Sequence, residues 1–311
     1  MTSFNILLTT VATMFIYIAV GYGARLLGFI DDVGTKKMTR FILNVAQPFM
    51  IVNAVISNEY SSAELKSGLI VFGIGLIVHT IGAVIAFFAT LPIKDGCERR
   101  VCEDSMIFAN CGFFGFPLVE ALFGSRGLFW GAFYVISFNI VCWTYGLFVL
   151  SRAKSTVKMK PLKMILNSGT VPCMIGIVLY LLRVQLPDFV LNAVRGMTGI
   201  CTPATLAVAG ALLANIPIKK LFTRPVVYYC SAVKMIVIPI ISSLILKLLG
   251  FGTEYVIFGA TMASLPTAAI IAMFAESYEI NPGLAAHNVG MSTLLTVMTI
   301  PAVTALVGLF A

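Results

Sequence analysis

Long apolar stretches alternate with short polar connections along the whole of this 311-residue chain. A helix that crosses a bilayer needs roughly 20 consecutive, mostly apolar residues, and ten stretches meet that length. They lie near residues 4–24, 38–57, 67–91, 104–123, 127–150, 162–183, 189–214, 225–249, 254–275 and 284–310. The pattern therefore predicts an all-α membrane protein with ten transmembrane helices.

Composition supports a multi-pass membrane protein. Hydrophobic residues make up 59% of the chain and charged residues only 11%, and the mean hydropathy is +0.99. Soluble proteins carry about 25% charged residues, so a soluble globular domain is excluded. No Lys or Arg precedes the first apolar stretch, so we expect that stretch to be a retained helix and not a cleaved signal peptide.

Basic residues gather in every second connection, and this orients the predicted helices. The richly basic connections lie near residues 25–40, 94–100, 152–163 and 219–224. The other side carries few basic residues, namely Lys66, Arg126, Arg183, Arg195 and Lys247. The positive-inside rule places the first set in the cytoplasm and both termini on the non-cytoplasmic side. The basic charge thus indicates topology in a lipid bilayer, and no nucleic-acid partner is expected.

Two apolar stretches contain a proline beside small or polar residues: FANCGFFGFPL over residues 108–118 and GATMASLPTAA over residues 259–269. Proline has no N–H to donate and clashes with the carbonyl four residues back. Pro117 is therefore expected to free the carbonyl of Phe113, and Pro266 that of Met262. Polar backbone is tolerated at membrane depth only where protein buries it or water reaches it. Broken helices in both halves of a chain indicate the binding site of a transporter.

The chain also reads as two related halves. The longest basic connection, over residues 151–163, divides the predicted helices into two sets of five. Pro48 and Pro203 lie in corresponding helices, 155 residues apart. An odd number of helices per repeat inverts the second copy in the membrane. We therefore predict a five-helix repeat over residues 1–155 and an inverted one over residues 156–311.

At the two broken stretches the chain resembles a known family. The segment NCGFFGFP, residues 110–117, follows the pattern N-x-x-x-x-G-x-P of the fourth helix in the auxin efflux carrier family, which includes plant PIN-formed carriers and bacterial permeases. The segment LPTAAIIAMFAESYEINP, residues 265–282, is similar to the ninth helix of that family and its exit. The long cytoplasmic loop of plant members is absent, which favours a bacterial type of permease in the plasma (inner) membrane.

The resemblance implies a fold shared with bile acid symporters and sodium/proton antiporters. Helices 1, 2, 6 and 7 would form a scaffold that makes a homodimer. Helices 3–5 and 8–10 would form a mobile core, with helices 4 and 9 crossing at their unwound centres. Family members carry organic anions by an elevator-type movement of that core. A small carboxylate is thus the implied substrate, with auxin-like aromatic acids and amino acids as alternatives.

The crossing is the predicted substrate site. The N-terminus of a half-helix carries roughly half a positive charge and holds anions through its N–H groups. The candidates on the first break are Asn110, Cys111, Gly112, Phe113, Gly115 and Pro117; those on the second are Met262, Ser264, Pro266 and Thr267; and those on the scaffold wall are Asn44, Gln47 and Thr202. Thr267 stands where plant carriers have a longer amide side chain, which disfavours auxin itself.

Lys234 is a cation deep inside an apolar stretch. It lies ten residues after Arg224, roughly 15 Å along a helix, and an ammonium at that depth costs at least about 2.5–3.5 kcal/mol. It therefore needs a partner. Lys234 is expected either to neutralise the substrate carboxylate or take the place of a sodium ion, or to bond a freed carbonyl such as that of Met262 in a structural role.

Two further ionisable residues have alternative roles. His79 is either a proton carrier, because imidazole titrates near neutral pH, or a satisfied interior histidine. Glu120 either pairs with Arg126 or takes part in coupling. Both a proton and a sodium ion are accordingly candidates for the coupling ion.

Other functional classes have little support in the sequence. An enzyme would need a nucleophile with a base, a carboxylate pair or a metal cluster, but the chain has two histidines, no HExxH and no GxGD. Its seven cysteines include no CxxC pair, so neither a metal nor a cofactor is expected. An ion channel is a less favoured alternative to a carrier, because no filter motif is present.

Overall fold

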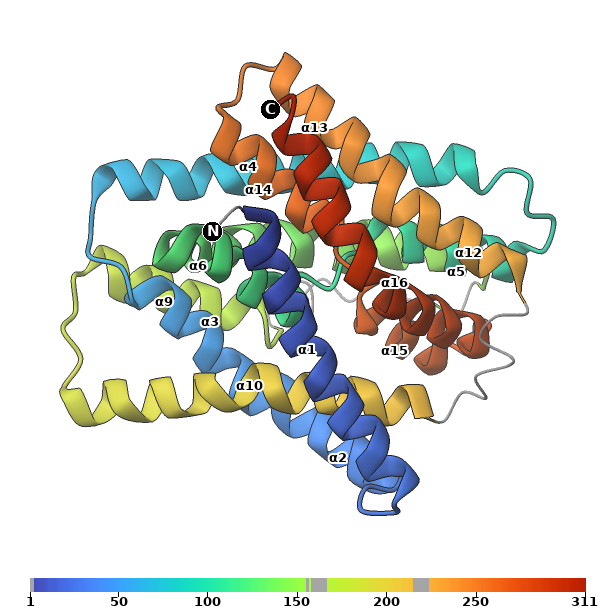
Figure 1. Cartoon of the computed structure of the whole chain (residues 1–311), viewed down its shortest axis with the longest axis horizontal. Helices are drawn as coiled ribbons and strands as arrows, with labels where there is room; N and C mark the ends of the chain where they lie inside the picture. Colours follow the sequence, from blue (N-terminus) through green and yellow to red (C-terminus); the bar gives the residue numbers. More distant parts are fainter. Residues whose placement is uncertain (1–2, 155–156, 158–166, 215–223) are drawn as a thin grey trace.

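The computed structural model describes residues 3–154, 157, 167–214 and 224–311, and helices joined by short connections dominate these ranges (Figure 1). The elements of the first half are α1 (Ser3–Leu26), α2 (Asp32–Phe41), η1 (Ile42–Ala46), α3 (Gln47–Ile56), α4 (Ser62–Ala89), α5 (Gly96–Ile107), η2 (Cys111–Gly115), α6 (Phe116–Val141), η3 (Cys142–Gly146) and α7 (Leu147–Ser151). Those of the second half are α9 (Thr170–Leu181), α10 (Asp188–Ala214), α12 (Pro225–Ala232), η4 (Val233–Val237), α13 (Ile238–Leu248), α14 (Thr253–Ala263), α15 (Ala269–Ser277) and α16 (Pro282–Gly308). Elements η1 to η4 are single π-helical turns.

Several helical segments are long and apolar enough to cross a membrane. Within the described residues there are six, which span Asp32–Ile56, Ser62–Ala89, Cys111–Ser151, Asp188–Ala214, Pro225–Leu248 and Pro282–Gly308. The third of these turns at Gly124, whose φ of 62° and ψ of −147° suit glycine. The all-α, multi-pass prediction is thus confirmed, while the number of ten transmembrane helices stays a prediction.

Three of the π-helical turns stand directly before a proline. Turns η1, η2 and η4 end two residues before Pro48, Pro117 and Pro239, and each proline occupies one of the first two positions of the next α-helix. Proline has no N–H and cannot donate a hydrogen bond to the preceding turn. The helix is rewound locally at the turn where that hydrogen bond is missing. π-helical turns are rare and frequently lie at functional sites.

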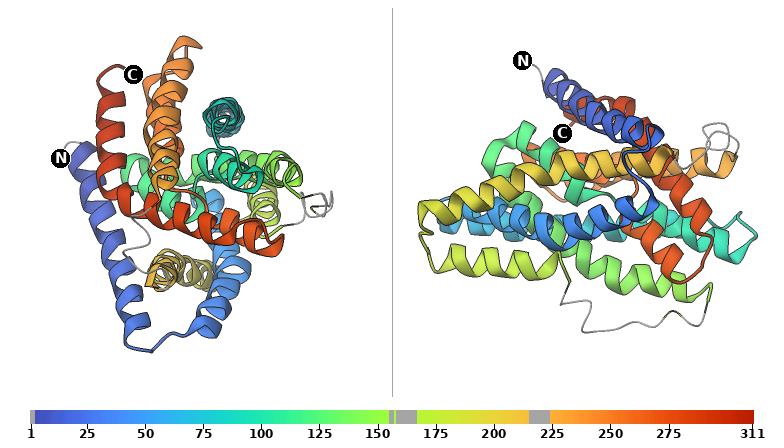
Figure 2. Two further views of the ribbon diagram at one scale, coloured as in Figure 1. Left: turned by 90° about the vertical axis from the view of Figure 1, so that its right-hand side faces the viewer. Right: turned by 90° about the horizontal axis from the view of Figure 1, so that it is seen from below.

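The helices pack in two groups (Figures 1 and 2). In the first group α10 lies against α1, α2 and α3, and α3 lies against α9. In the second, α4 lies against α6 and α13, and α16 lies against α12, α14 and α15. The groups meet where α6 contacts α1, α3 and α9. Helix α1 also contacts α16 across the two groups. The division into a scaffold and a moving core stays a prediction, and the predicted repeat boundary at residues 155 and 156 lies outside the described residues.

Helices α1 and α10 touch backbone to backbone. A Cβ placed on Gly21 would lie 1.8 Å from the carbonyl oxygen of Ala207, and one on Gly210 would lie 1.9 Å from that of Ile18. Small residues let membrane helices approach this closely. The two glycines therefore set the spacing of this helix pair, because no side chain fits between the backbones.

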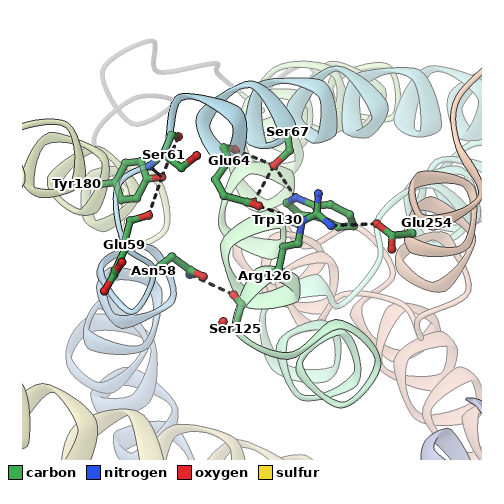
Figure 3. Close-up of polar contacts among 10 residues, drawn as sticks. All are labelled: Asn58, Glu59, Ser61, Glu64, Ser67, Ser125, Arg126, Trp130, Tyr180 and Glu254. Atoms are coloured by element: carbon green, nitrogen blue, oxygen red, sulfur yellow. Dashed lines mark hydrogen bonds and ion pairs between the residues drawn. The ribbon is translucent and has the colours of Figure 1, made fainter.

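Arg126 lies at the centre of a charged cluster at the ends of three helices (Figure 3). Its Nη1 donates to Glu254 Oε2 at 3.1 Å, its Nε lies 3.3 Å from Glu64 Oε1, and its guanidinium lies 4.7 Å from the ring centre of Trp130. Both acids occupy first turns of helices, where the helix dipole favours negative charge. The predicted pair of Arg126 with Glu120 is therefore wrong. Arg126 pairs instead with Glu64 and Glu254, which lie in distant parts of the sequence.

The connection between α3 and α4 is anchored to both groups of helices in the same region (Figure 3). Asn58 Nδ2 donates to the carbonyl oxygen of Ser125 at 3.2 Å, and the backbone N–H of Ser61 donates to Tyr180 Oη at 3.0 Å. Ser125 precedes the long part of α6, and Tyr180 belongs to α9. These bonds fix the predicted outer ends of the helices relative to one another.

Candidate functional site

Both helices predicted to be broken are interrupted. Helix α5 ends at Ile107 and η2 begins at Cys111, and in the second half α14 ends at Ala263 and α15 begins at Ala269. Pro266 lies inside the second break, as predicted. Pro117 does not lie in the first break, because the chain leaves the helix at residues 108–110 and Pro117 stands at the start of α6. The unwound residues therefore lie at the start of the predicted stretch 108–118, about one turn before Phe113, the residue whose carbonyl Pro117 is expected to free.

The two breaks pair with each other. Ala109 and Thr267 form an isolated antiparallel bridge. The N–H of Asn110 donates to the carbonyl oxygen of Pro266 at 2.8 Å, and the N–H of Ala268 donates to that of Phe108 at 2.9 Å. Backbone groups freed by the breaks thus satisfy one another, as buried backbone must. The crossing is a two-stranded joint between segments that lie more than 150 residues apart in the sequence.

The hydroxyl groups of the second break are bonded within the protein. Thr267 Oγ1 donates to the carbonyl oxygen of Ser105 at 2.9 Å, and the Thr267 N–H donates to Ser292 Oγ at 3.0 Å. Ser264 Oγ donates to the carbonyl oxygen of Thr261 at 2.9 Å. Both predicted ligand residues are buried. Thr267 therefore ties the joint to α5 through its hydroxyl and to α16 through its N–H, whereas the Ser264 hydroxyl bonds the end of its own helix, α14.

Residues of the first break pack closely against the scaffold and the second break. A Cβ on Gly112 would lie 3.1 Å from Gln47 Nε2, and one on Gly115 would lie 3.1 Å from Leu265 Cδ1 and from Met262 Cε. Gln47 Oε1 is buried without a hydrogen-bond partner among the described residues. Gln47 thus lies beside η2, directly after the first break, and its role in a substrate site stays a prediction.

Other predicted site residues lie in different surroundings. Asn110 caps η2, since its Oδ1 accepts from the N–H of Phe113 at 3.4 Å. Cys111 and Phe113 are buried. Asn44 is exposed on η1, where its Nδ2 donates to the carbonyl oxygen of Arg40 at 2.8 Å. Asn44 therefore bonds its own helix, and no described contact brings it to the joint.

Lys234 holds the end of α5. It lies in η4 with 1% of its surface exposed, and its Nζ donates to the carbonyl oxygen of Ile107 at 3.3 Å. Ile107 is the last residue of α5, where carbonyls lack helical partners and the dipole favours a cation. The hydrogen-bond partner of Lys234 therefore lies at the first break. The predicted structural role had placed that partner at Met262, beside the second break.

His79 is a satisfied interior residue. Its side chain is 1% exposed and lies among the rings of Phe108, Tyr134 and Phe138. Its Nδ1 bonds the carbonyl oxygen of Gly75 at 2.6 Å, and since a carbonyl only accepts, Nδ1 carries the proton. This geometry favours the structural alternative for His79.

A cavity of about 330 Å³ lies between helices α3 and α10 of the first group and the start of α6. It is lined by Met50, Asn53, Phe116, Pro117, Glu120, Leu128, Arg195, Thr198, Gly199 and Thr202. Three predicted site residues, Pro117, Glu120 and Thr202, thus line one cavity, and its α6 wall begins at Phe116, directly after η2. Its volume falls at the lower end of the range of about 300–1,000 Å³ usual for small-molecule sites.

Two polar features of this region were missed from the sequence. Arg195 was treated only as a topological charge, although residues 195, 198, 199 and 202 follow the spacing of one helix face. Glu103 and Asp104 were also missed, and both are fully buried just before the first break. Glu103 pairs with Arg100. The run CEDS, so close to an apolar break, was the signal for the buried acids.

Comparisons with known proteins agree with the geometry. The model of a family described as membrane transport protein matches residues 6–304. An uncharacterized transporter of Methanothermobacter thermautotrophicus is 21% identical over 296 residues, which cover 94% of this chain and 95% of that protein. An uncharacterized transporter of Methanocaldococcus jannaschii is 24% identical over 125 residues, or 38% of this chain and 39% of that protein. Since the family match spans nearly the whole chain, the protein belongs to the membrane transport proteins of the auxin efflux carrier family.

Proposed function

We propose that the protein is a secondary transporter that carries a small organic anion with a carboxylate group across the plasma membrane. The observations that support this most are the two helix breaks that pair with each other, together with a cavity at the start of α6, the helix that follows the first break. Broken helices of this kind form the substrate sites of many secondary transporters. Arg195 on the cavity wall adds a formal cation suited to a carboxylate.

The proposed architecture is ten transmembrane helices in two inverted repeats. In this proposal the second group of helices moves as an elevator past the first, and the scaffold group makes a homodimer. The cavity supports this division, because α3 and α10 of the first group form one wall and α6 of the second group forms the other. A ligand held between the walls would be released when they part.

A ligand screen tests the proposed substrate class. The purified protein in detergent is heated with a panel of succinate, malate, glutamate and indole-3-acetate, with choline and sucrose as controls. A ligand at 100 times its Kd stabilises the folded state by about 2.7 kcal/mol, so at least one acid should raise the melting temperature. If choline or sucrose stabilised the protein and no acid did, the proposed function would be wrong.

Replacing Lys234 with Met tests its role in transport. We expect uptake into proteoliposomes of the acid identified by the screen to fall about tenfold or more. The bond from the ammonium to Ile107 fixes the end of α5, and a hydrogen bond to a charged group contributes about 1.5–3 kcal/mol, where 1.4 kcal/mol corresponds to tenfold. Lys247→Met, at the far end of the same helical segment, is the control. Unchanged kinetics in Lys234→Met would remove this lysine from the mechanism.

A further inference from the structure

The cavity between α3, α10 and α6 carries one charge of each sign on opposite walls. Arg195 belongs to α10, in the first group of helices, and Glu120 belongs to α6, in the second. Among the described residues neither side chain forms an ion pair, although both line the same cavity of about 330 Å³. The formal charge on the cavity wall is therefore zero, and each charge is available to a ligand.

The remaining lining residues extend each wall of the cavity beyond its charged residue. Thr198 and Thr202 follow Arg195 on the same face of α10, and Thr202 lies seven residues further on, roughly 10 Å along the helix. Pro117 lies one turn before Glu120 at the start of α6. On each wall the lining thus extends one to two helical turns away from the charged residue.

Arg195 and Glu120 favour different charged groups on a ligand. A guanidinium offers a planar fork that binds a carboxylate through two hydrogen bonds. A carboxylate such as that of Glu120 repels a second negative group and attracts an ammonium. A dicarboxylate bound at Arg195 would bring a second negative charge into the cavity that Glu120 also lines. A ligand with one carboxylate and one ammonium meets an opposite charge on each wall.

We propose that the substrate is a zwitterion of the amino-acid type, whose carboxylate is bound by Arg195 and whose ammonium is bound by Glu120. This inference rests on the proposed carboxylate transporter and replaces its net anion with a zwitterion that carries the same carboxylate. Arg195 and Glu120 are then the residues that determine specificity, and the ligand bridges the two groups of helices.

Matched pairs of ligands that differ only by an ammonium group test the proposal. The dissociation constants of the full-length protein in detergent are measured by titration calorimetry for alanine against propionate, 4-aminobutyrate against butyrate, and aspartate against succinate. At least one amino acid is expected to bind tenfold or more tightly than its partner. Equal affinity within every pair would overturn the zwitterion proposal and leave the carboxylate transporter in place. If none of the six ligands bound, both proposals would fail.

Charge variants assign the two ends of the ligand. Glu120→Gln is expected to abolish the preference for the amino acid while the deaminated acid keeps its affinity, and Arg195→Gln is expected to weaken both at least tenfold. Lys66→Gln and Asp188→Asn, exposed residues outside the cavity lining, are the controls. Melting temperatures without ligand show that each variant is folded. An undiminished preference in Glu120→Gln, or undiminished binding in Arg195→Gln, would overturn the assignment.

Discussion

Proline at position 268 is expected to separate the two breaks, lower the melting temperature and abolish uptake. Ala268 has φ −66° and ψ 132°, so proline, with φ near −65°, fits the backbone. It removes the N–H that donates to the carbonyl of Phe108 at 2.9 Å and places ring atoms against that oxygen. A buried acceptor left without a partner costs about 1–3 kcal/mol. Thermal unfolding in detergent and uptake into proteoliposomes measure the two effects.

The neighbouring substitution Ala269→Pro is a matched control. Ala269 is the first residue of α15, where proline is favoured because that N–H has no helical acceptor. Residue 268 is already extended, as a residue before proline prefers. We therefore expect Ala269→Pro to keep the melting temperature of the unmodified protein. Equal melting temperatures for the two variants would mean that the bond between the breaks does not stabilise the crossing.

A methyl group at position 210 is expected to destabilise the protein strongly. The Cβ of Gly210→Ala would lie 1.9 Å from the carbonyl oxygen of Ile18 and 2.9 Å from the backbone nitrogen of Tyr22. Overpacking typically costs about 1–3 kcal/mol. Since these are backbone atoms, which cannot rotate aside, we expect a loss of about 3 kcal/mol or more in the free energy of unfolding. Thermal or denaturant unfolding in detergent checks this value.

Gly196→Ala on the same helix provides the comparison. A Cβ on Gly196 has no neighbouring atom within 4 Å, and alanine favours a helix over glycine by about 1 kcal/mol. We expect this variant to be as stable as the unmodified protein or slightly more stable. Two variants of equal stability would contradict the close approach of α1 and α10.

The lengths of the apolar stretches predicted the membrane class and most helices. They could do so because every residue of a membrane-spanning helix lies in lipid or in the protein interior, so the whole stretch must be mostly apolar. Residues 259–269 predicted the second break because Pro266 lies within it. Residues 108–118 contain the first break, but its exact place at residues 108–110 has a tertiary cause: the segment around Ala109 is extended because it pairs with Thr267. A partner so distant in the sequence leaves no local signal at residue 109.

Side-chain pairing was the least predictable part of the site. Thr267 was correctly placed at the break, but its hydroxyl bonds the carbonyl of Ser105, a contact set by how α5 meets the second half. Arg126 pairs with Glu64 and Glu254 for the same reason. The role of Arg195 depends on a cavity formed by three helices, and such a space follows from assembly and not from any one segment.

The joint between the breaks also constrains how the protein is made. Its hydrogen bonds connect Asn110 to Pro266 and Phe108 to Ala268, so no ribosome-bound chain shorter than about 270 residues contains both sides. Until the ninth predicted helix enters the bilayer, the polar backbone at residues 108–110 must be covered by water, the insertion machinery or temporary neighbours. The crossing is consequently completed late in biosynthesis, and a truncated first half would expose an interrupted helix without its mate.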